Sequence, residues 1–336
     1  MRKGTIVLVS LITSLSLSAQ ITVKDLSLKF VLYESAYELY TLNVVKPLYL
    51  RASLTMNCRD SRQYKHFLIK TYHSLPDERK EQLRTIFTRH GSWYHMNQAA
   101  CIPDSAGIEE IMNNSLPPDK FDSLSIRDAK RFLPFYYENF LKSYIAGISG
   151  PIHAKILSIQ SNPAYTSLDI ISFMEKESGV SFSKRYKPEF YYTLSFTQAC
   201  GFNCNDRKIS TLPRNTKPKQ IISTPFHEYS HEFFQTFTRT EEFTVLADSM
   251  KSDKKIMRVY EMVGKYAYDW TGWIEENLVS GFSLYLEYRL HHSYTADYTP
   301  FDKEFCKFLI SEKFNPQKET LRDISFRFLR EKLAKH

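Results

Sequence analysis

The sequence predicts an α+β fold that is mostly helical, with a small mixed sheet beside a helix near residue 230. The first observation is that apolar residues recur every three or four positions over much of the chain, which is the helical period. The second is a single segment, Phe190 to Phe196, in which large apolar residues alternate with other residues at a strict period of two. The third is the length of 336 residues, which suits one large domain or two small ones.

The first 19 residues have the pattern of a signal peptide. Arg2 and Lys3 form a basic start, residues 6–17 form an apolar run, and Ser18-Ala19 supplies small residues for cleavage. The run is short for a bilayer span, and no later stretch reaches 18 apolar residues. We therefore expect an exported protein without a transmembrane segment in its mature chain. A buried N-terminal helix is the alternative.

Residues 20–150 are expected to form an N-terminal, mainly helical region. Residues 21–56 begin with alternating apolar positions, which predicts a strand or two followed by a helix. Residues 77–90 have a helical apolar face, and Gly91 stands where a C-terminal cap is expected.

A long helix is predicted over residues 125–145, with Pro134 expected to kink or split it. The segment from Gly147 to Pro151 then predicts a break, because it holds two glycines and a proline. We take this break as the boundary with a C-terminal core of residues 151–336. The further helices expected in that core cover residues 167–177, 219–237, 255–268, 273–290 and 321–333.

The stretch His227-Glu228-Tyr229-Ser230-His231 fits the pattern H-E-x-x-H. On a helix, His227 and His231 would lie one turn apart on the same face, able to bind one Zn²⁺ together. Zinc lowers the pKa of a bound water to about 7, and Glu228 would act on that water as general base. The motif therefore predicts a zinc hydrolase.

The flanks of this motif indicate a buried helix. The alternative is a surface helix with two solvated histidines, but four phenylalanines crowd the segment, and buried histidines need partners. The start of the helix stays open. Thr224 as N-cap with Pro225 at the first helical position is one solution, and a start near Lys219 is the other.

We expect the third zinc ligand to lie downstream of the motif. The extended pattern H-E-x-x-H-x-x-G-x-x-H is absent, because Phe234 and Phe237 occupy its last Gly and His positions. The segment 273–281 offers Glu275 and Glu276, which point about 100° apart on a helix. Glu276 shares its face with small residues that let another helix approach closely, so Glu276 is favoured as the ligand.

Together these two motifs resemble the gluzincin branch of the zincin metallopeptidases, and are most similar to a group of secreted bacterial zincins with a Trp-x-x-Glu-polar-Leu-Val pattern. That pattern also selects Glu276. The sequence departs from the better-known gluzincins at Ser280, where they carry an acid that orients a ligand histidine.

The resemblance implies further site residues. Gluzincins use a Tyr or His near the third ligand to stabilise the oxyanion, which makes Tyr266 or Tyr268 candidates, with His291 or His292 as others. Zincins bind extended substrates along an edge strand upstream of the motif helix. Here that strand would be Phe190 to Phe196, with substrate-binding positions at Tyr191, Tyr192, Thr193 and Leu194. An internal strand without a free edge is the alternative.

The cysteine content and the net charge limit the possible disulfides and partners. Five cysteines leave at least one unpaired or in an intermolecular bond, and the spacing of Cys200 and Cys204 suits a tight local disulfide, with a second metal site as the alternative. The net charge of +8 is spread along the chain rather than gathered into a basic stripe, so we expect no nucleic-acid partner.

The sequence thus predicts an exported zinc-dependent metallopeptidase, periplasmic or secreted, that acts on a peptide or protein substrate. An intact Glu228 favours hydrolysis, because a protein that only binds does not need the base. A zinc-bound but inactive peptide-binding protein is the alternative, and a helical structural protein with an accidental motif is the third reading.

Overall fold

The computed structural model describes residues 21–45, 58–162, 165, 167–196, 199–217, 221–266, 268–294 and 299–334. The predicted signal peptide, residues 1–19, lies outside this part of the chain. None of the described helices is both long and apolar enough to cross a membrane.

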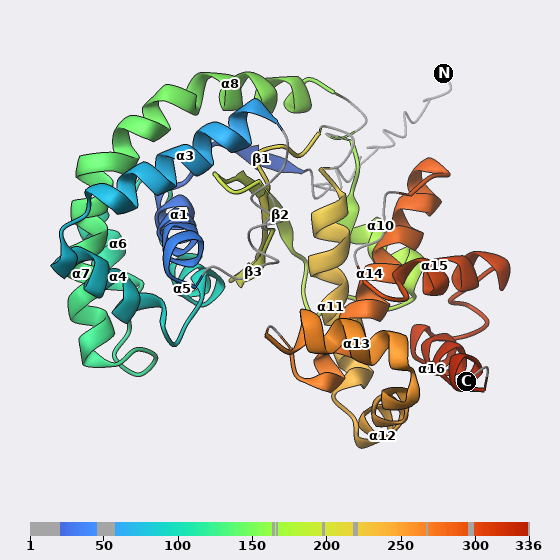
Figure 1. Ribbon diagram of the computed structural model, residues 1–336. Helices are drawn as coiled ribbons and strands as arrows, with labels where there is room; N and C mark the ends of the chain where they lie inside the picture. The colour runs from blue at the N-terminus through green and yellow to red at the C-terminus, as the bar shows by residue number, and fades with distance from the viewer. Residues whose placement is uncertain are drawn as a thin grey trace, which may run out of the picture.

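The N-terminal half is built from helices, with one short strand at its start (Figure 1). Its elements are β1 (Thr22–Lys24), α1 (Leu28–Tyr40), η1 (Thr41–Val45), α3 (Arg59–Ser74), α4 (Asp77–Phe87), α5 (Ser92–Ala99), α6 (Ile108–Asn114), α7 (Ser123–Tyr136), η2 (Tyr137–Leu141) and α8 (Lys142–Gln160).

The C-terminal half begins with one helix and three strands and ends in helices (Figure 1). Its elements are α10 (Ile170–Ser178), β2 (Lys187–Tyr192), β3 (Gly201–Cys204), β4 (Arg207–Leu212), α11 (Ser223–Thr238), α12 (Glu241–Ser249), η4 (Met250–Ser252), α13 (Lys254–Met262), η5 (Gly264–Tyr266), α14 (Trp270–His291), α15 (Asp302–Ser311) and α16 (Leu321–Leu333).

The four described strands form one mixed sheet with the order β1-β2-β4-β3. β1, β2 and β4 run parallel, with Val23 opposite Phe190 and Phe190 opposite Ser210. β3 runs antiparallel to β4 and places Phe202 opposite Ile209. The predicted fold class, α+β and mostly helical with a small mixed sheet, is therefore confirmed.

The sheet separates two hydrophobic cores, because successive side chains of a strand point to opposite faces. Phe190 and Tyr192 pack into the core that holds α11 and α14. Tyr191 and Phe202 pack into the core formed by the N-terminal helices. Figure 1 shows this arrangement, with the strands between the two groups of helices.

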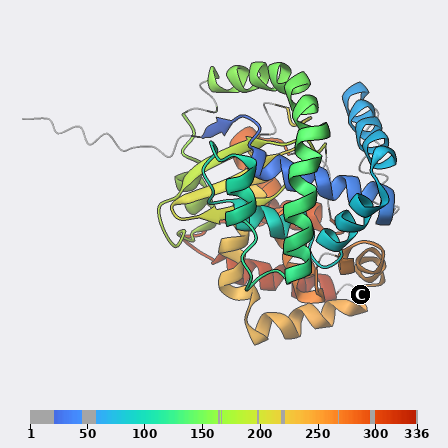
Figure 2. The ribbon, with the colours of Figure 1, turned by 90° about the vertical axis from the view of Figure 1, so that its left-hand side faces the viewer.

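The break predicted between Gly147 and Pro151 is wrong. α7, η2 and α8 follow one another along the chain, and α8 runs through both residues and arches over the top of the molecule (Figures 1 and 2). A proline inside a helix costs about 3 kcal/mol. Beyond it, α8 buries Ile152, Ile156 and Ile159, each worth about 1.5–3 kcal/mol, so packing outweighs the local preference. The predicted domain boundary therefore falls inside a helix.

Pro134 does not split its helix either. It lies within α7, and the chain then passes through the π-helical turn η2 into α8. A π-helical turn is one way in which a helix absorbs a local disturbance of its hydrogen bonds.

A local disulfide between Cys200 and Cys204 is not formed. Cys204 is bonded to Cys101, and Cys200 is a buried free thiol. The reason is β3, which extends the chain from residue 201 to residue 204. Positions four apart in a strand are separated by about 13 Å, whereas the bonded pair has a Cα–Cα distance of 5.4 Å.

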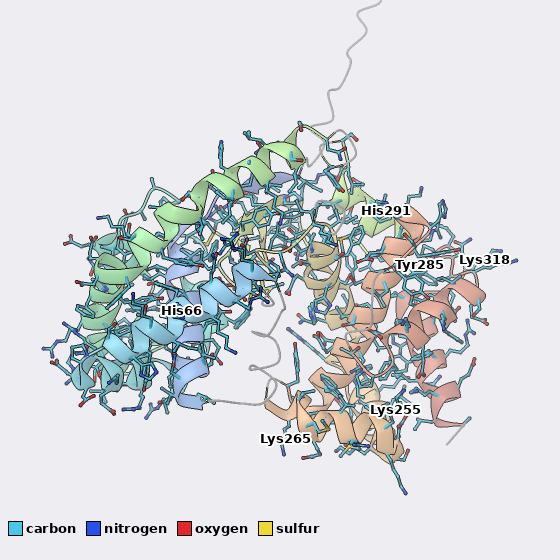
Figure 3. The ribbon with its side chains drawn as sticks, turned by 45° about the horizontal axis from the view of Figure 1, so that its top comes forward. His66, Lys255, Lys265, Tyr285, His291 and Lys318 are labelled. Atoms are coloured by element: carbon cyan, nitrogen blue, oxygen red, sulfur yellow. A yellow bond between two sulfur atoms is a disulfide. The ribbon has the colours of Figure 1, made fainter. Side chains whose placement is uncertain are left out.

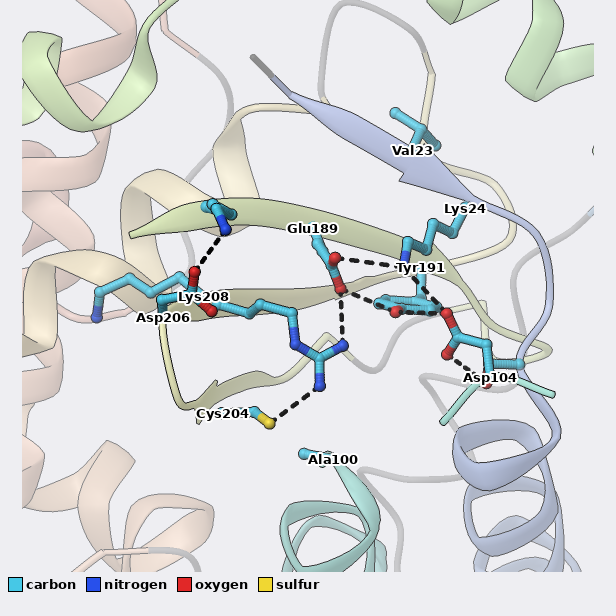
Figure 4. A network of polar contacts seen from close by, with 12 residues as sticks. Val23, Lys24, Ala100, Asp104, Glu189, Tyr191, Cys204, Asp206 and Lys208 are labelled. Carbon is cyan, nitrogen blue, oxygen red and sulfur yellow. Dashed lines mark hydrogen bonds and ion pairs between the residues drawn. The ribbon is translucent and has the colours of Figure 1, made fainter. Parts of the chain in front are cut away.

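A polar network fixes the sheet to the helical half (Figure 4). Asp104 lies 3.0 Å from the ammonium of Lys24 and 2.9 Å from that of Lys29. The hydroxyl of Tyr191 donates to Asp104 and to Glu189, at 3.0 Å each. Burial raises the pKa of Asp104, but the two lysines outweigh burial and lower that pKa to about 2. The Asp104 carboxylate therefore remains charged at neutral pH.

Candidate functional site

The helix that carries the motif is anchored deep in the protein. Pro225 lies in the first turn of α11, where its missing N–H costs no helical hydrogen bond. The helix thus begins at Ser223, between the two starts that the sequence left open. Tyr229 donates a 2.8 Å hydrogen bond to the carbonyl of Lys208 in β4, which ties the helix to the sheet.

One face of α11 is buried and the motif lies beside it. The four phenylalanines are between 0% and 3% exposed, which excludes the surface-helix alternative. They are Phe226, Phe233, Phe234 and Phe237. The side chains of His227 and His231 are 24% and 25% exposed, and His227 lines a pocket.

The second helix of the site is α14. Asp269 caps its start by accepting a 2.7 Å hydrogen bond from the N–H of Gly272. Most of the helix is buried, and it packs against α11 along the stripe that holds Ser280 and Ser283. The hydroxyl of Ser283 donates to the carbonyl of Ser223 at 3.4 Å. These small side chains allow the close approach that the sequence predicted.

Three side chains converge between these helices. Ligand atoms of His227, His231 and Glu276 all lie within 4.8 Å of one another. Glu276 Oε1 is 3.2 Å from His227 Nε2, and Glu276 Oε2 is 3.5 Å from His231 Nε2. The two imidazole rings are nearly perpendicular, with centroids 5.2 Å apart. The sequence brought forward these three residues, and the fold places them together.

The spacing of these donors suits one tetrahedral ion. Donors that each lie 2.0–2.2 Å from a tetrahedral zinc ion are about 3.3–3.6 Å apart. The two nitrogen–oxygen distances, 3.2 Å to Oε1 and 3.5 Å to Oε2, involve different oxygens of the carboxylate, and each is close to that range. Glu276 Oε2 is also buried and accepts no hydrogen bond from the described residues. Two imidazoles and one carboxylate are a donor set that zinc takes in hydrolytic sites.

The charges of these side chains shift one another's pKa. Burial lowers the pKa of His227, but the adjacent Glu276 carboxylate outweighs burial and, with Glu228, raises that pKa to about 9. Burial raises the pKa of Glu276, but His227 and His231 outweigh it and, with a hydrogen bond from Tyr268, lower that pKa to about 2. Without a metal ion, a proton on His227 therefore supplies the positive charge that the buried carboxylate requires.

Glu275 lies outside the cluster and contacts one of its histidines. Its Oε1 is 2.9 Å from Nδ1 of His231, the ring nitrogen opposite the one that faces Glu276. The hydroxyl of Ser280 is 3.5 Å from Nδ1 of His227. The structure thus separates the neighbouring glutamates, as the helical-face argument predicted.

Glu228 is held against the edge strand. Burial raises the pKa of its carboxyl, which the two histidines and the N–H of Gly201 partly offset. A Cβ added to Gly201 would lie 2.6 Å from both Cβ and Oε2 of Glu228. Only glycine leaves room for this contact between β3 and α11, and sequence reasoning missed this residue.

Of the residues predicted to stabilise an oxyanion, Tyr268 lies at the pocket and the two histidines do not. Tyr268 lines the same pocket and hydrogen-bonds Glu276, and burial raises the pKa of its hydroxyl. The side chain of Tyr266 lies outside the part of the chain that is described. His291 is exposed at the far end of α14 (Figure 3), about 22 Å along the helix from Glu276. His292, which follows it, is equally remote, so neither histidine reaches the site.

The pocket has a volume of about 600 Å³ and opens in front of the motif. The loop between β2 and β3 contributes Phe196 and Ala199 to its wall, and the segment after β4 contributes Pro213, Asn215 and Thr216. The predicted substrate-binding segment ended at Phe196, and neither Ala199 nor the segment after β4 was identified from the sequence as part of the site.

The strand that was predicted to bind substrate is an internal strand, not an edge strand. β2 lies between β1 and β4 and has no free edge. The four named positions are each 0% exposed, and two of them follow the end of the strand. They are Tyr191, Tyr192, Thr193 and Leu194. Among the described strands, β3 is the edge beside α11.

One local signal could have located β3. Asn205-Asp206 joins β3 to β4, and Asn205 has a positive φ of 54°, as hairpin turns of two residues require. The short strand before it was considered only as a pair of cysteines.

Comparison with family models, curated proteins and solved structures found no match for this chain. The likeness to zincins therefore depends on its two short motifs and on the geometry described above.

Proposed function

We propose that this protein is a zinc-dependent metallopeptidase of the gluzincin type. The observation that carries the proposal is the convergence of His227, His231 and Glu276, with donor spacings that suit one tetrahedral ion. Glu228, a half-buried carboxyl next to the two histidines, lines the same pocket.

The residues divide into distinct roles. His227, His231 and Glu276 would hold the zinc ion, which supplies Lewis-acid activation of a water and a carbonyl. Glu228 accepts the proton of the attacking water and returns it to the leaving amine. Tyr268 donates a hydrogen bond to the oxygen that gains negative charge.

A peptide substrate is favoured by the edge strand. An extended peptide can pair with backbone groups of β3, and Gly201 in that strand touches the base. Pairing there would bring a scissile bond toward Glu228 without requiring a particular side chain. This moves the proposed binding edge from Phe190–Phe196 to Gly201–Cys204.

Export is part of the proposal. The basic start and apolar run of the first 19 residues support it. The Cys101–Cys204 disulfide is independent support, because such bonds persist in oxidising compartments such as the periplasm.

The test combines metal analysis with peptide digestion. Protein purified without added zinc should contain about one zinc per chain. It should cleave a diverse peptide library, stop when a chelator is added and resume when zinc is restored. Glu228→Gln should keep the zinc and lose nearly all turnover, since the base is not a ligand.

Two results would point elsewhere. Zinc at full occupancy without cleavage of any peptide would favour the alternative, a zinc-bound protein that holds peptides without cutting them. Unchanged turnover in Glu228→Gln would reject the assignment of the base.

A further inference from the structure

We propose that Glu275 is a positioning residue of this centre, holding the His231 ring so that Nδ1 donates to Glu275 and Nε2 faces the metal position. The inference rests on the proposed function, because it assumes that His231 is a ligand. It assigns a role to an acid that the motif itself does not include.

The contacts of Glu275 show a carboxylate that is fully engaged by α11. Oε1 lies 2.9 Å from Nδ1 of His231 and accepts a longer bond, 3.4 Å, from the amide of Gln235. Oε2 accepts a 2.5 Å hydrogen bond from the hydroxyl of Thr238. The side chain is 13% exposed. A carboxylate bound in this way has little freedom to swing toward the ligand cluster.

These contacts of Glu275 follow from the spacing of residues along α11 and α14. His231, Gln235 and Thr238 are spaced by four and three residues, so they line one face of α11. Glu275 meets that face from α14. Its neighbour Glu276 points about 100° away and meets His227 and His231 instead. Glu275 and Glu276 therefore approach the His231 ring at its two different nitrogens.

The two ligand histidines differ in their outer partners. His231 has a charged acceptor at 2.9 Å, whereas His227 has the neutral hydroxyl of Ser280 at 3.5 Å. A carboxylate that accepts from the distal nitrogen fixes the tautomer and makes the other nitrogen a stronger metal donor.

The test measures zinc affinity, not turnover. Wild type, Glu275→Gln and Glu275→Ala are titrated against a chromophoric chelator at neutral pH. Loss of such a partner typically weakens metal binding about 10–100-fold, which we expect for Glu275→Ala. Glu275→Gln keeps an acceptor oxygen without the charge, so its loss should be about tenfold or less. Glu81→Ala is the control, because Glu81 is exposed on α4 and pairs with Arg84.

A second readout reports the hydrogen bond itself. In zinc-loaded protein, the Nδ1–H proton of His231 should appear far downfield in a nitrogen–proton correlation spectrum and move upfield in Glu275→Gln. Circular dichroism identifies any variant that fails to fold. If Glu275→Ala does not fold, the spectrum of Glu275→Gln decides the question.

The outcomes are distinct. Zinc affinity of Glu275→Ala equal to that of wild type, or an unmoved His231 proton in Glu275→Gln, would overturn the inference. Complete loss of zinc in Glu275→Ala with retention in Glu276→Ala would make Glu275 the ligand, which also overturns it. Absence of zinc binding in wild type would reject the proposed function, and the wild-type titration reports that result separately.

Discussion

Gly201→Ala is expected to impair catalysis strongly while leaving the zinc bound. The added Cβ would lie 2.6 Å from Cβ of Glu228, whereas carbon atoms in contact are about 3.5–4.0 Å apart. Rotation of the Glu228 carboxylate cannot relieve this overlap, because its Cβ is fixed by the backbone of α11. β3 and α11 must therefore separate by about 1 Å.

The magnitude follows from that displacement. Overpacking of this kind costs about 1–3 kcal/mol of folding stability. A displacement of about 1 Å at a reacting group can cost about 10²-fold in rate. We therefore expect kcat/KM to fall about 100-fold, with zinc stoichiometry near one because Gly201 does not contact the three ligands.

Gly147→Ala is the matched control. A Cβ there meets nothing within 4 Å, and the residue lies in α8, where alanine stabilises a helix by about 0.5–1 kcal/mol. The control should keep the wild-type rate and match or exceed wild-type stability in urea. Full kcat/KM in Gly201→Ala would refute the claim that β3 positions the base.

Two further predictions concern stability. In zinc-free protein, ionised His227 stabilises the fold below its ordinary pKa of about 6.5, and this contribution is lost as pH rises toward about 9. Glu276 contributes above about pH 4.3, and its contribution is lost as pH falls toward about 2. Thermal unfolding should thus show the metal-free protein weakening between about pH 6.5 and 9, and a flat profile there would contradict the pairing. Removal of the Cys101–Cys204 bond, which joins residues 103 positions apart, should cost about 2–5 kcal/mol in urea unfolding, whereas Cys58→Ser should cost nothing measurable.

The sequence predicted the parts of the site that depend on local spacing. His227 and His231 are one helical turn apart, so their common face follows from the helix alone. Glu276 could be preferred over Glu275 because its helical face carries small residues, and the structure places it beside both histidines.

The predictions that were wrong concern features that depend on contacts between distant segments. The alternation from Phe190 to Phe196 predicts a strand, but it contains no information on which strands lie on either side. The partner of Cys204 is 103 residues away, and no local pattern points to Cys101. Gly147 and Pro151 break most helices, and only the burial of residues beyond them explains why α8 continues.

The N-terminal half contributes to the candidate site although the described His-His-Glu cluster lies entirely in the C-terminal half. β3 begins at Gly201, against Glu228, and ends at Cys204, bonded to Cys101. Between them, Phe202 stacks on Phe30 of α1, with ring centroids 5.5 Å apart. The N-terminal helices therefore hold the strand that lies against Glu228.

A buried carboxylate extends this support to the pocket wall. Glu34 of α1 is 0% exposed and accepts hydrogen bonds from the N–H groups of Leu194 and Ser195, at 3.0 and 3.1 Å. The next residue, Phe196, lines the pocket. Burial and the nearby Glu38 raise the pKa of Glu34, so these two N–H donors are needed to stabilise any charge on it. The helical half thus fixes both the edge strand and the loop that precedes it, which explains why the motif helix and its partner alone do not define the pocket.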